Sequence, residues 1–203
     1  MKRRFLRKRS NAKGMTLIEL MIACFVLAVG MLGSLAMIFL AIATNSRNKF
    51  DTTGTMVAQT VIEQINTLPT NATQGGAFVT AINLTDCQVT DASGTVTHAA
   101  TTHSISIQSG DIGVPTGAAL VPNNDSDLSR KPGDIDFSET APPAGYNMKW
   151  HTCGDIEYDV RWNIIQISER SKLVTVAARQ QIFSRNNVKM YAPPVTLRSI
   201  SGP

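Results

Sequence analysis

Charge is missing from a long stretch near the amino terminus. From Leu20 to Ala43 the chain has 24 consecutive residues without a charged side chain. As a helix this run would be roughly 36 Å long at about 1.5 Å per residue, against about 30 Å for the hydrocarbon core of a bilayer. A secretory signal peptide has a shorter apolar core that ends in a small-residue cleavage site. The run therefore predicts a retained membrane span.

Proline is missing from Met15 to Leu68, and Pro69 follows directly. Beyond Thr44, apolar residues recur every three or four positions with polar residues between them, which is typical of an amphipathic helix. Proline ends such a pattern at the preceding residue. The sequence therefore predicts one helix over 15–68, with a transmembrane segment at about 15–43 and an amphipathic second half. The apolar face of that half comprises Phe50, Gly54, Val57, Val61, Ile65 and Leu68, flanked by Met56 and Ile62.

Acidic residues are missing from residues 1–14, whose seven basic residues are Lys2, Arg3, Arg4, Arg7, Lys8, Arg9 and Lys13. The whole chain has a formal net charge of +4, but residues 15–203 have 19 − 7 = 12 basic and 15 acidic residues, a net charge of −3. The basic cluster could bind phosphate. The membrane run behind it favours a topology signal instead, because Lys and Arg stay on the cytoplasmic side of a span. No nucleic-acid partner is expected.

Cysteine is scarce, with three residues in the chain. Cys24 lies in the apolar run and is expected to pack as a small apolar residue. Cys87 and Cys153 lie in the polar part of the chain, and export to an oxidising compartment would favour a disulfide between them. Such a bridge across 66 residues would contribute roughly 4 kcal/mol. Two unrelated buried thiols are the alternative.

Residues that bind metals or carry out catalysis form no recognised pattern. His98, His103 and His151 are scattered, and His151-x-Cys153 has no second pair of ligands, so no metal site is expected. No Gly-x-Ser-x-Gly motif, phosphate-binding loop or paired Cys/His constellation is present, which argues against an enzyme and against a cofactor. A solvated acidic loop is favoured over a calcium site, since the spacing of its acids is not that of an EF-hand: Asp125, Asp127, Asp134, Asp136 and Glu139.

The residues after Pro69 predict a β-rich part. The clearest strand is Ile156–Ile167, which alternates at period two, and the polar turn Ser168–Lys172 joins it to an antiparallel partner, Leu173–Phe183. The partner's expected inner face is Val174, Val176, Ala178 and Ile182. Shorter candidates are Ala77–Ile82, Gln88–Thr90 and Ser104–Gln108. An isolated hairpin is marginal, and the amphipathic helix supplies a surface to cover it. The fold class is α+β, with the long helix packed on an antiparallel sheet that forms a head over 69–203.

Two stretches of the head are expected to lack regular structure. Gly110–Gly145 contains five prolines and five glycines and predicts a long surface loop, of the kind that is commonly functional or disordered. The tail from Ala192 to Pro203 has a similar composition. Neither stretch predicts a strand.

Glu19 is a lone acid at the start of the apolar run. An ionisable side chain within a membrane-length segment costs about 2.5–3.5 kcal/mol on insertion scales, so such a residue usually has an assigned partner. The residues around it, Lys13-Gly14-Met15-Thr16-Leu17-Ile18-Glu19-Leu20, resemble the class III signal of type IV pilins and type II secretion pseudopilins. The resemblance implies cleavage after Gly14 by a prepilin peptidase and methylation of the new amino terminus on Met15. Met15 departs from the phenylalanine that is most common there.

Three further segments resemble a narrower group, the minor pilins called type IV pilus modification proteins: Leu27–Gly33, Ala58–Ile65 and Tyr158–Trp162. The resemblance implies a pilin fold and a minor pilin that initiates or modifies pilus assembly. Its partners would be other major and minor pilins, the prepilin peptidase and an inner-membrane assembly platform. The chain would cross the inner membrane once, with its head in the periplasm, and enter a pilus at the cell surface.

Cleavage would place a positive amine at Met15, four residues before Glu19. Opposite charges within about 4–6 Å favour each other's charged forms, so Glu19 can pair with this amine in its own subunit or in a neighbour and thereby set the register of assembly. The alternative is a carboxylate that the helix dipole favours at the membrane surface. Alternative functions are a type II secretion minor pseudopilin, a tip adhesin or DNA-uptake pilin that uses the Gly110–Gly145 loop, and an anchored receptor or periplasmic enzyme.

Overall fold

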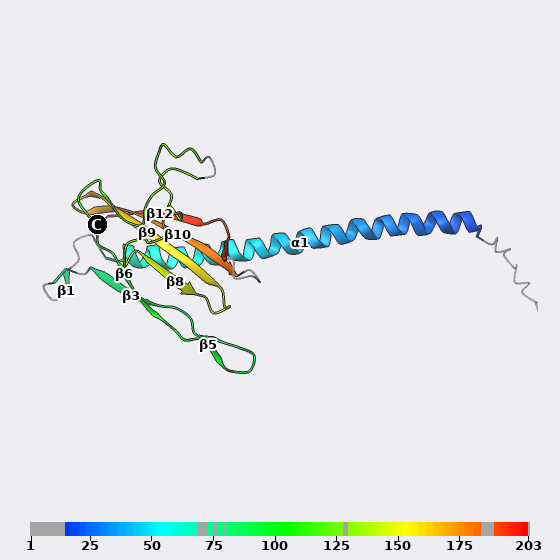
Figure 1. The fold of residues 1–203 in the computed structure, drawn as a ribbon, viewed down its shortest axis with the longest axis horizontal. Coiled ribbons are helices and arrows are strands. Elements are labelled where there is room, and N and C mark those ends of the chain that lie inside the picture. The colour runs from blue at the N-terminus through cyan, green and yellow to red at the C-terminus, as the bar shows by residue number, and fades with distance from the viewer. Residues whose placement is uncertain are drawn as a thin grey trace, which may run out of the picture. The chain divides into compact units, whose positions relative to one another are not determined.

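The computed structural model describes residues 15–68, 73–74, 77–78, 80–127, 130–183 and 189–202. Its contacts divide the chain into two compact units, one ending at Arg47 and one beginning at Asn48. Helix α1 (Leu17–Asn66) runs through both units, and all described strands belong to the second (Figure 1). The predicted α+β layout, a long amino-terminal helix packed on antiparallel sheets, is confirmed and is consistent with the pilin fold.

The first half of α1 is exposed throughout. Every described residue from Met15 to Lys49 is exposed in the isolated chain. By length and composition the helix could cross a membrane. Its observed bounds lie two residues inside the predicted 15–68 at each end.

The described strands are short except in one hairpin. They are β1 (Thr73–Gln74), β2 (Ala77–Phe78), β3 (Ala81–Thr85), β4 (Val89–Thr90), β5 (Val96–His98), β6 (Thr102–Ser106), β7 (Pro115–Gly117), β8 (Asn147–His151), β9 (Glu157–Ser168), β10 (Ser171–Phe183), β11 (Lys189–Tyr191) and β12 (Val195–Ser201). The β9–β10 hairpin confirms the two long strands predicted from alternation. The three shorter candidates are confirmed in position with shifted bounds, as β2 and β3, β4, and β6.

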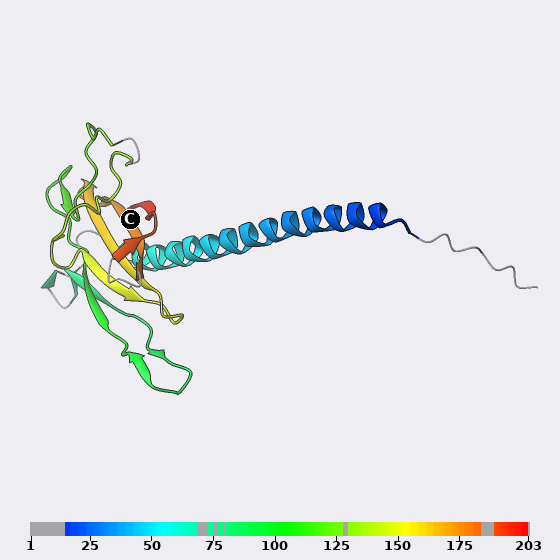
Figure 2. The same cartoon turned by 45° about the vertical axis from the view of Figure 1, so that its right-hand side comes forward.

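The hairpin is the centre of a six-stranded antiparallel sheet. The outer edge of β10 pairs first with β12, over Lys172–Ala178, and then with β11 near its end. The outer edge of β9 pairs with β8 near its start and with β7 further along. Strands β3 and β6 form a separate ladder, and β4 and β5 continue it into an arm that projects from the sheet in both Figure 1 and Figure 2.

One face of the sheet packs against the second half of α1. Because side chains alternate along a strand, Tyr158, Val160, Trp162 and Ile164 of β9 share this face with Val174, Val176 and Ala178 of β10. They form the main core with Val57, Ala58, Val61, Ile62 and Ile65 of α1. The predicted apolar face of α1 is therefore correct at its centre. Of the two flanking residues, Ile62 is buried and Met56 is 63% exposed, so only the Ile62 side of the face is covered. The side chain of Ile182 lies outside the described residues.

Helix and sheet approach each other closely at Gly54. A Cβ atom added there would lie 3.2 Å from Cε1 of Tyr158, tighter than ordinary van der Waals contact. The Tyr158 hydroxyl donates a hydrogen bond to the carbonyl of Phe50 over 3.0 Å. The missing side chain at Gly54 thus makes room for the ring, whose hydroxyl satisfies the helix backbone.

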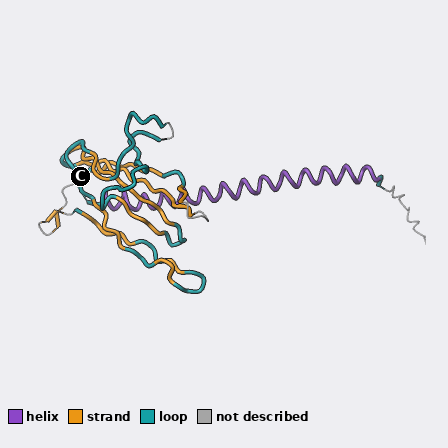
Figure 3. The backbone as a smooth tube through the Cα atoms, viewed as in Figure 1, coloured by secondary structure: helices purple, strands orange, loops and turns teal. Residues whose placement is uncertain are grey.

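The opposite face of the sheet is covered by part of the predicted surface loop, 118–139. Ala118 and Ile135 are buried against Ala177 of β10. Asn163 donates to the carbonyl of Ala118 over 2.8 Å, and Arg161 donates to the carbonyl of Glu139 over 2.8 Å. Figure 3 draws the described connections between the strands as teal loops. The described residues of 118–139 contain no helix or strand, as predicted for a loop, although Ala118 and Ile135 are buried against the sheet. The expectation that 110–145 lacks regular structure is wrong at β7, because Pro115–Gly117 pairs with β9.

The tail and the hairpin turn also differ from expectation. The expectation that Ala192–Pro203 lacks regular structure is wrong, since β12 adds seven residues to the edge of β10. Lys172, expected in a polar turn, lies within β10 and is 1% exposed. Its Nζ donates to the carbonyls of Ile65 over 2.7 Å and Leu68 over 2.8 Å. Carbonyls of the last helical turn have no partner within the helix, and Lys172 supplies one.

Burial lowers the pKa of Lys172 to about 8 from an ordinary value of 10.5. Between these values the unfolded chain binds more protons than the folded chain, so the free energy of unfolding rises with pH in this window. We expect wild type to gain stability over Lys172→Met between pH 8 and 10, with a slope of up to about 1.4 kcal/mol per pH unit.

The measurement is denaturant unfolding of both proteins in detergent, followed by the fluorescence of buried Trp162. Burial also raises the pKa of Tyr158. Because both proteins contain this tyrosine, its effect cancels when the free energy of unfolding of the variant is subtracted from that of wild type. Parallel stability curves across this pH range would contradict the assignment.

Candidate functional site

The amino-terminal end of α1 is capped by Thr16. The backbone N–H of Glu19 donates to Oγ1 of Thr16 over 3.3 Å, and the N–H of Leu20 donates to the Thr16 carbonyl over 3.2 Å. A Thr at the cap and a Glu three residues later form the capping-box pattern. The Thr-x-x-Glu spacing is visible in the sequence, and the hydrogen bond to Oγ1 is the half of this pattern that Thr16 supplies.

Glu19 is exposed in the first turn of α1, where the helix dipole favours a negative charge. Met15 is also exposed and directly precedes the cap. Gly14 and the basic residues before it lie outside the described residues. The structure therefore places Glu19 and Met15 at one helix end. Cleavage at Gly14 stays a prediction.

The first half of α1 presents apolar side chains on all sides. Phe25, Leu32, Met37 and Leu40 are among the exposed large side chains. Cys24, the free cysteine among the described residues, is exposed in the same region. A helix that is apolar all round is buried in a membrane or among other helices. This surface, with its single acid at the start, has the chemistry of a membrane anchor.

A second candidate site lies in the head beside the predicted disulfide. Cys87 and Cys153 are bonded, which confirms the predicted pair. Cys87 directly follows Asp86, which is the first residue after β3, and Cys153 comes two residues after His151, the last residue of β8. The bridge therefore fastens the ends of two strands from different ladders.

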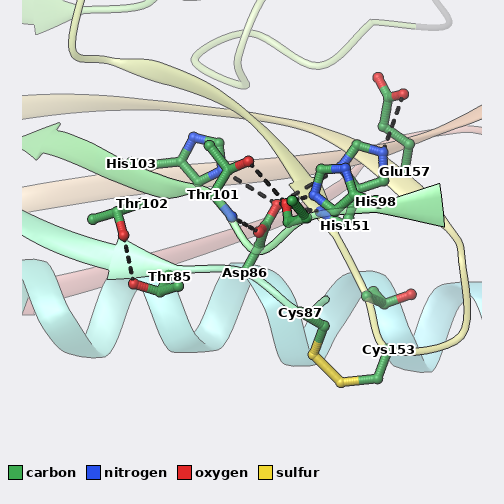
Figure 4. A network of polar contacts seen from close by, with 12 residues as sticks. Thr85, Asp86, Cys87, His98, Thr101, Thr102, His103, His151, Cys153 and Glu157 are labelled. Atoms are coloured by element: carbon green, nitrogen blue, oxygen red, sulfur yellow. Dashed lines mark hydrogen bonds and ion pairs between the residues drawn. A yellow bond between two sulfur atoms is a disulfide. The ribbon is translucent and has the colours of Figure 1, made fainter. Parts of the chain in front are cut away.

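The three histidines of the chain converge at this place. His98 ends β5, His103 lies in β6 and His151 ends β8. Figure 4 shows their rings gathered round the carboxylate of Asp86. The distances from Asp86 Oδ2 are 3.1 Å to His98 Nε2, 3.4 Å to His103 Nε2 and 3.7 Å to His151 Nδ1. The histidines are scattered in sequence but clustered in the fold.

The Asp86 carboxylate is fully buried yet ionised. Burial acts to raise its pKa. Hydrogen bonds from the Thr101 N–H, the His151 N–H and the imidazoles of His98 and His103 outweigh burial, so the pKa of Asp86 lies below its ordinary value. Oδ1 accepts the Thr101 N–H over 2.6 Å, and Oδ2 accepts the His151 N–H over 3.3 Å. The rings of His98 and His151 stack with centroids 3.6 Å apart.

The acids of the predicted loop do not converge in this way. Arg130 pairs with Asp125 over 2.9 Å and also with Asp136, and Arg198 pairs with Asp134 over 2.8 Å. These pairs line an open cleft of about 1050 Å³ between the loop and the β10–β12 edge. Because arginines neutralise these carboxylates, the loop has the chemistry of an ion-pair network rather than of a calcium site.

Residues 9–35 match the family described as the prokaryotic N-terminal methylation motif. The matched segment spans Gly14, Met15 and Glu19 and runs into the exposed apolar half of α1. No curated protein and no solved structure matched the chain. The motif and the apolar helix together are consistent with type IV pilin-like proteins and suggest membrane anchoring.

Loss of the disulfide should destabilise the head. Closing a 66-residue loop restricts the unfolded chain, and loop-entropy models give about 4 kcal/mol for this length. We expect reduction with dithiothreitol and the double change Cys87→Ser/Cys153→Ser to lower the free energy of unfolding by similar amounts. Denaturant unfolding in a Cys24→Ser background measures this without thiol exchange. If reduction leaves the unfolding curve unchanged, the bridge has no such role.

Proposed function

We propose that this protein is a minor type IV pilin, a structural subunit that initiates or modifies pilus assembly. A prepilin peptidase cleaves it after Gly14, and the amine of Met15 is then methylated. The apolar half of α1 holds the subunit in the inner membrane and later packs among the helices of other pilins. The head occupies the periplasm and then the surface of the fibre.

One observation carries this proposal: the methylation motif at 9–35 leads directly into an exposed apolar helix. The helix continues into a half whose buried side chains form the core of the head. An anchored enzyme that shares only an export signal would have no need for one helix to serve as both anchor and core. The polar constellation at Asp86 lies beside a structural disulfide, and we assign the chain a structural role rather than an enzymatic one.

Cleavage after Gly14 is the first test. Full-length chain co-expressed with a prepilin peptidase should give a product whose amino-terminal sequence begins at Met15. Gly14→Val should remain uncut, because a peptidase site that requires glycine does not admit a branched side chain. An uncut wild-type chain, or a cut at another bond, would refute the pilin proposal. Deletion strains then distinguish the alternatives, since lost pili support a pilus subunit and blocked exoprotein release supports a type II secretion pseudopilin.

The charge of Glu19 is the second test. Both Glu and Gln serve at the third position of a capping box, so Glu19→Gln keeps the helix cap and removes only the charge. If the carboxylate pairs with the Met15 amine of a neighbour, Glu19→Gln and Glu19→Ala should both be processed normally and enter fibres at least tenfold less than wild type. Immunoblots of sheared fibre fractions and of membranes measure this ratio.

Thr16→Ala is the matched control for the cap. It removes the Oγ1 acceptor of the Glu19 N–H and leaves the charge in place. Normal incorporation of Glu19→Gln together with a defect in Thr16→Ala would show that capping, rather than charge pairing, is the function of this end.

A further inference from the structure

We propose that Asp86, His98 and His151 form a binding site for a divalent transition-metal ion, with zinc as the ion that fits best. One oxygen or nitrogen atom from each of these residues lies within 4.8 Å of the others. The chain has three histidines in 203 residues, and all three contact the same carboxylate. Sequence spacing gives no hint of this site, because His98 and His151 lie 12 and 65 positions after Asp86.

The distances between the ligand atoms suit a tetrahedral ion. Zinc bonds to histidine nitrogen and carboxylate oxygen are about 2.0–2.1 Å, so neighbouring ligand atoms in a tetrahedral site lie about 3.3 Å apart. Asp86 Oδ2 is 3.1 Å from His98 Nε2 and 3.7 Å from His151 Nδ1. Shifts of a few tenths of an ångström would bring both nitrogens to this spacing from Oδ2. The rings of His98 and His151 are stacked, and an imidazole lone pair lies in the plane of its ring, so binding also requires one of these partly exposed rings to turn toward the ion.

His151 Nδ1 is the atom that hydrogen bonding leaves unexplained. It is buried and has no hydrogen-bond partner among the described residues. Its 3.7 Å separation from Asp86 Oδ2 is too long for a hydrogen bond. A metal ion between the two atoms would use the free lone pair of this nitrogen and the negative charge of the carboxylate together.

The residues around these ligands are those that orient a metal site. The other ring nitrogen of His151, Nε2, lies 3.7 Å from Glu157 Oε2, which is an ion-pair distance rather than a hydrogen bond. If the ring shifts to bind an ion, this carboxylate is placed to accept the Nε2–H, as carboxylates do behind many metal-binding histidines. His103 reaches Asp86 Oδ2 at 3.4 Å and helps to hold the carboxylate. The Cys87–Cys153 bridge and the Thr101 N–H fix Asp86 and His151 from either side.

The types of ligand atom determine which ions the site would bind, and the exposed edges of the histidine rings would let an ion reach it from solvent. Two imidazoles and one carboxylate suit zinc, copper and nickel, whereas calcium and magnesium prefer oxygen ligands. The side chain of Asp86 is 0% exposed, while those of His98 and His151 are 22% and 21% exposed. An ion can therefore enter past the ring edges, and a water molecule would complete its fourth position.

The test uses the full-length chain in detergent, without a histidine tag, stripped with EDTA and desalted. Titration calorimetry with zinc chloride should give one zinc per chain, and zinc should raise the thermal unfolding temperature. Cobalt chloride should give the visible absorption of a tetrahedral site. Calcium and magnesium chloride should give neither heat nor stabilisation. Absence of zinc binding to the wild-type chain would overturn the proposal.

Variants locate the site. His98→Gln and His151→Gln should each abolish zinc binding, and Glu157→Gln and His103→Gln should each weaken it about tenfold or more. Cys24→Ser is the matched control, because it removes the free thiol and should bind zinc as wild type does. Each histidine variant is accepted only if its EDTA-treated form unfolds cooperatively with its disulfide intact. Zinc binding that persists in His98→Gln and His151→Gln would overturn the proposal, as would its loss in Cys24→Ser.

Discussion

The contact between the second half of α1 and the β9–β10 hairpin is the interaction on which the rest of the head depends. Val57, Val61 and Ile65 cover side chains of the hairpin that would otherwise expose a wide apolar face. Gly54 and Tyr158 set how closely helix and sheet approach. With that face covered, the outer edge of β9 pairs with β7 and β8, and the outer edge of β10 pairs with β11 and β12. The opposite face of the hairpin then packs against Ala118 and Ile135 of the loop. The membrane-length half of α1 is thereby covalently continuous with the core of the folded domain.

The elements that could be predicted from the sequence are those in which apolar residues recur at regular spacing. In α1 the pattern recurs every three or four residues, and in β9 it alternates over many positions, so both were predictable. Strand β12 was not, because its pairing with β10 rather than its own alternation makes it a strand. Lys172 was placed in a turn because free lysines prefer water. Only the fold shows that two backbone carbonyls, one in the last turn of α1 and one just after it, replace the water around its amine.

The two candidate sites differ in the same way. The amino-terminal signal is contiguous, so its residues are recognisable without a structure. Glu19 stands out in the sequence alone as an acid at the start of a long uncharged run. The cluster at Asp86 draws on residues in or next to four separate elements, β3, β5, β6 and β8. Its ligands have no spacing that a sequence pattern could detect. What the sequence does contain is Cys87 and Cys153, and these residues mark where the elements meet.

The lysine that closes the end of α1 also ties that helix to a late part of the chain. Lys172 lies 107 residues after Ile65 and 104 after Leu68 in sequence, yet its amine binds the carbonyls of both, in the last turn of α1 and just after it. The first half of α1 needs no such distant contact, since a membrane-length apolar helix satisfies its own backbone groups. A chain that emerges in order can therefore be anchored well before its head has a core. Contacts between residues so far apart make folding slow. The apolar face of α1 is thus fully covered only once both β9 and β10 are available, and until then its uncovered part lies next to the membrane surface.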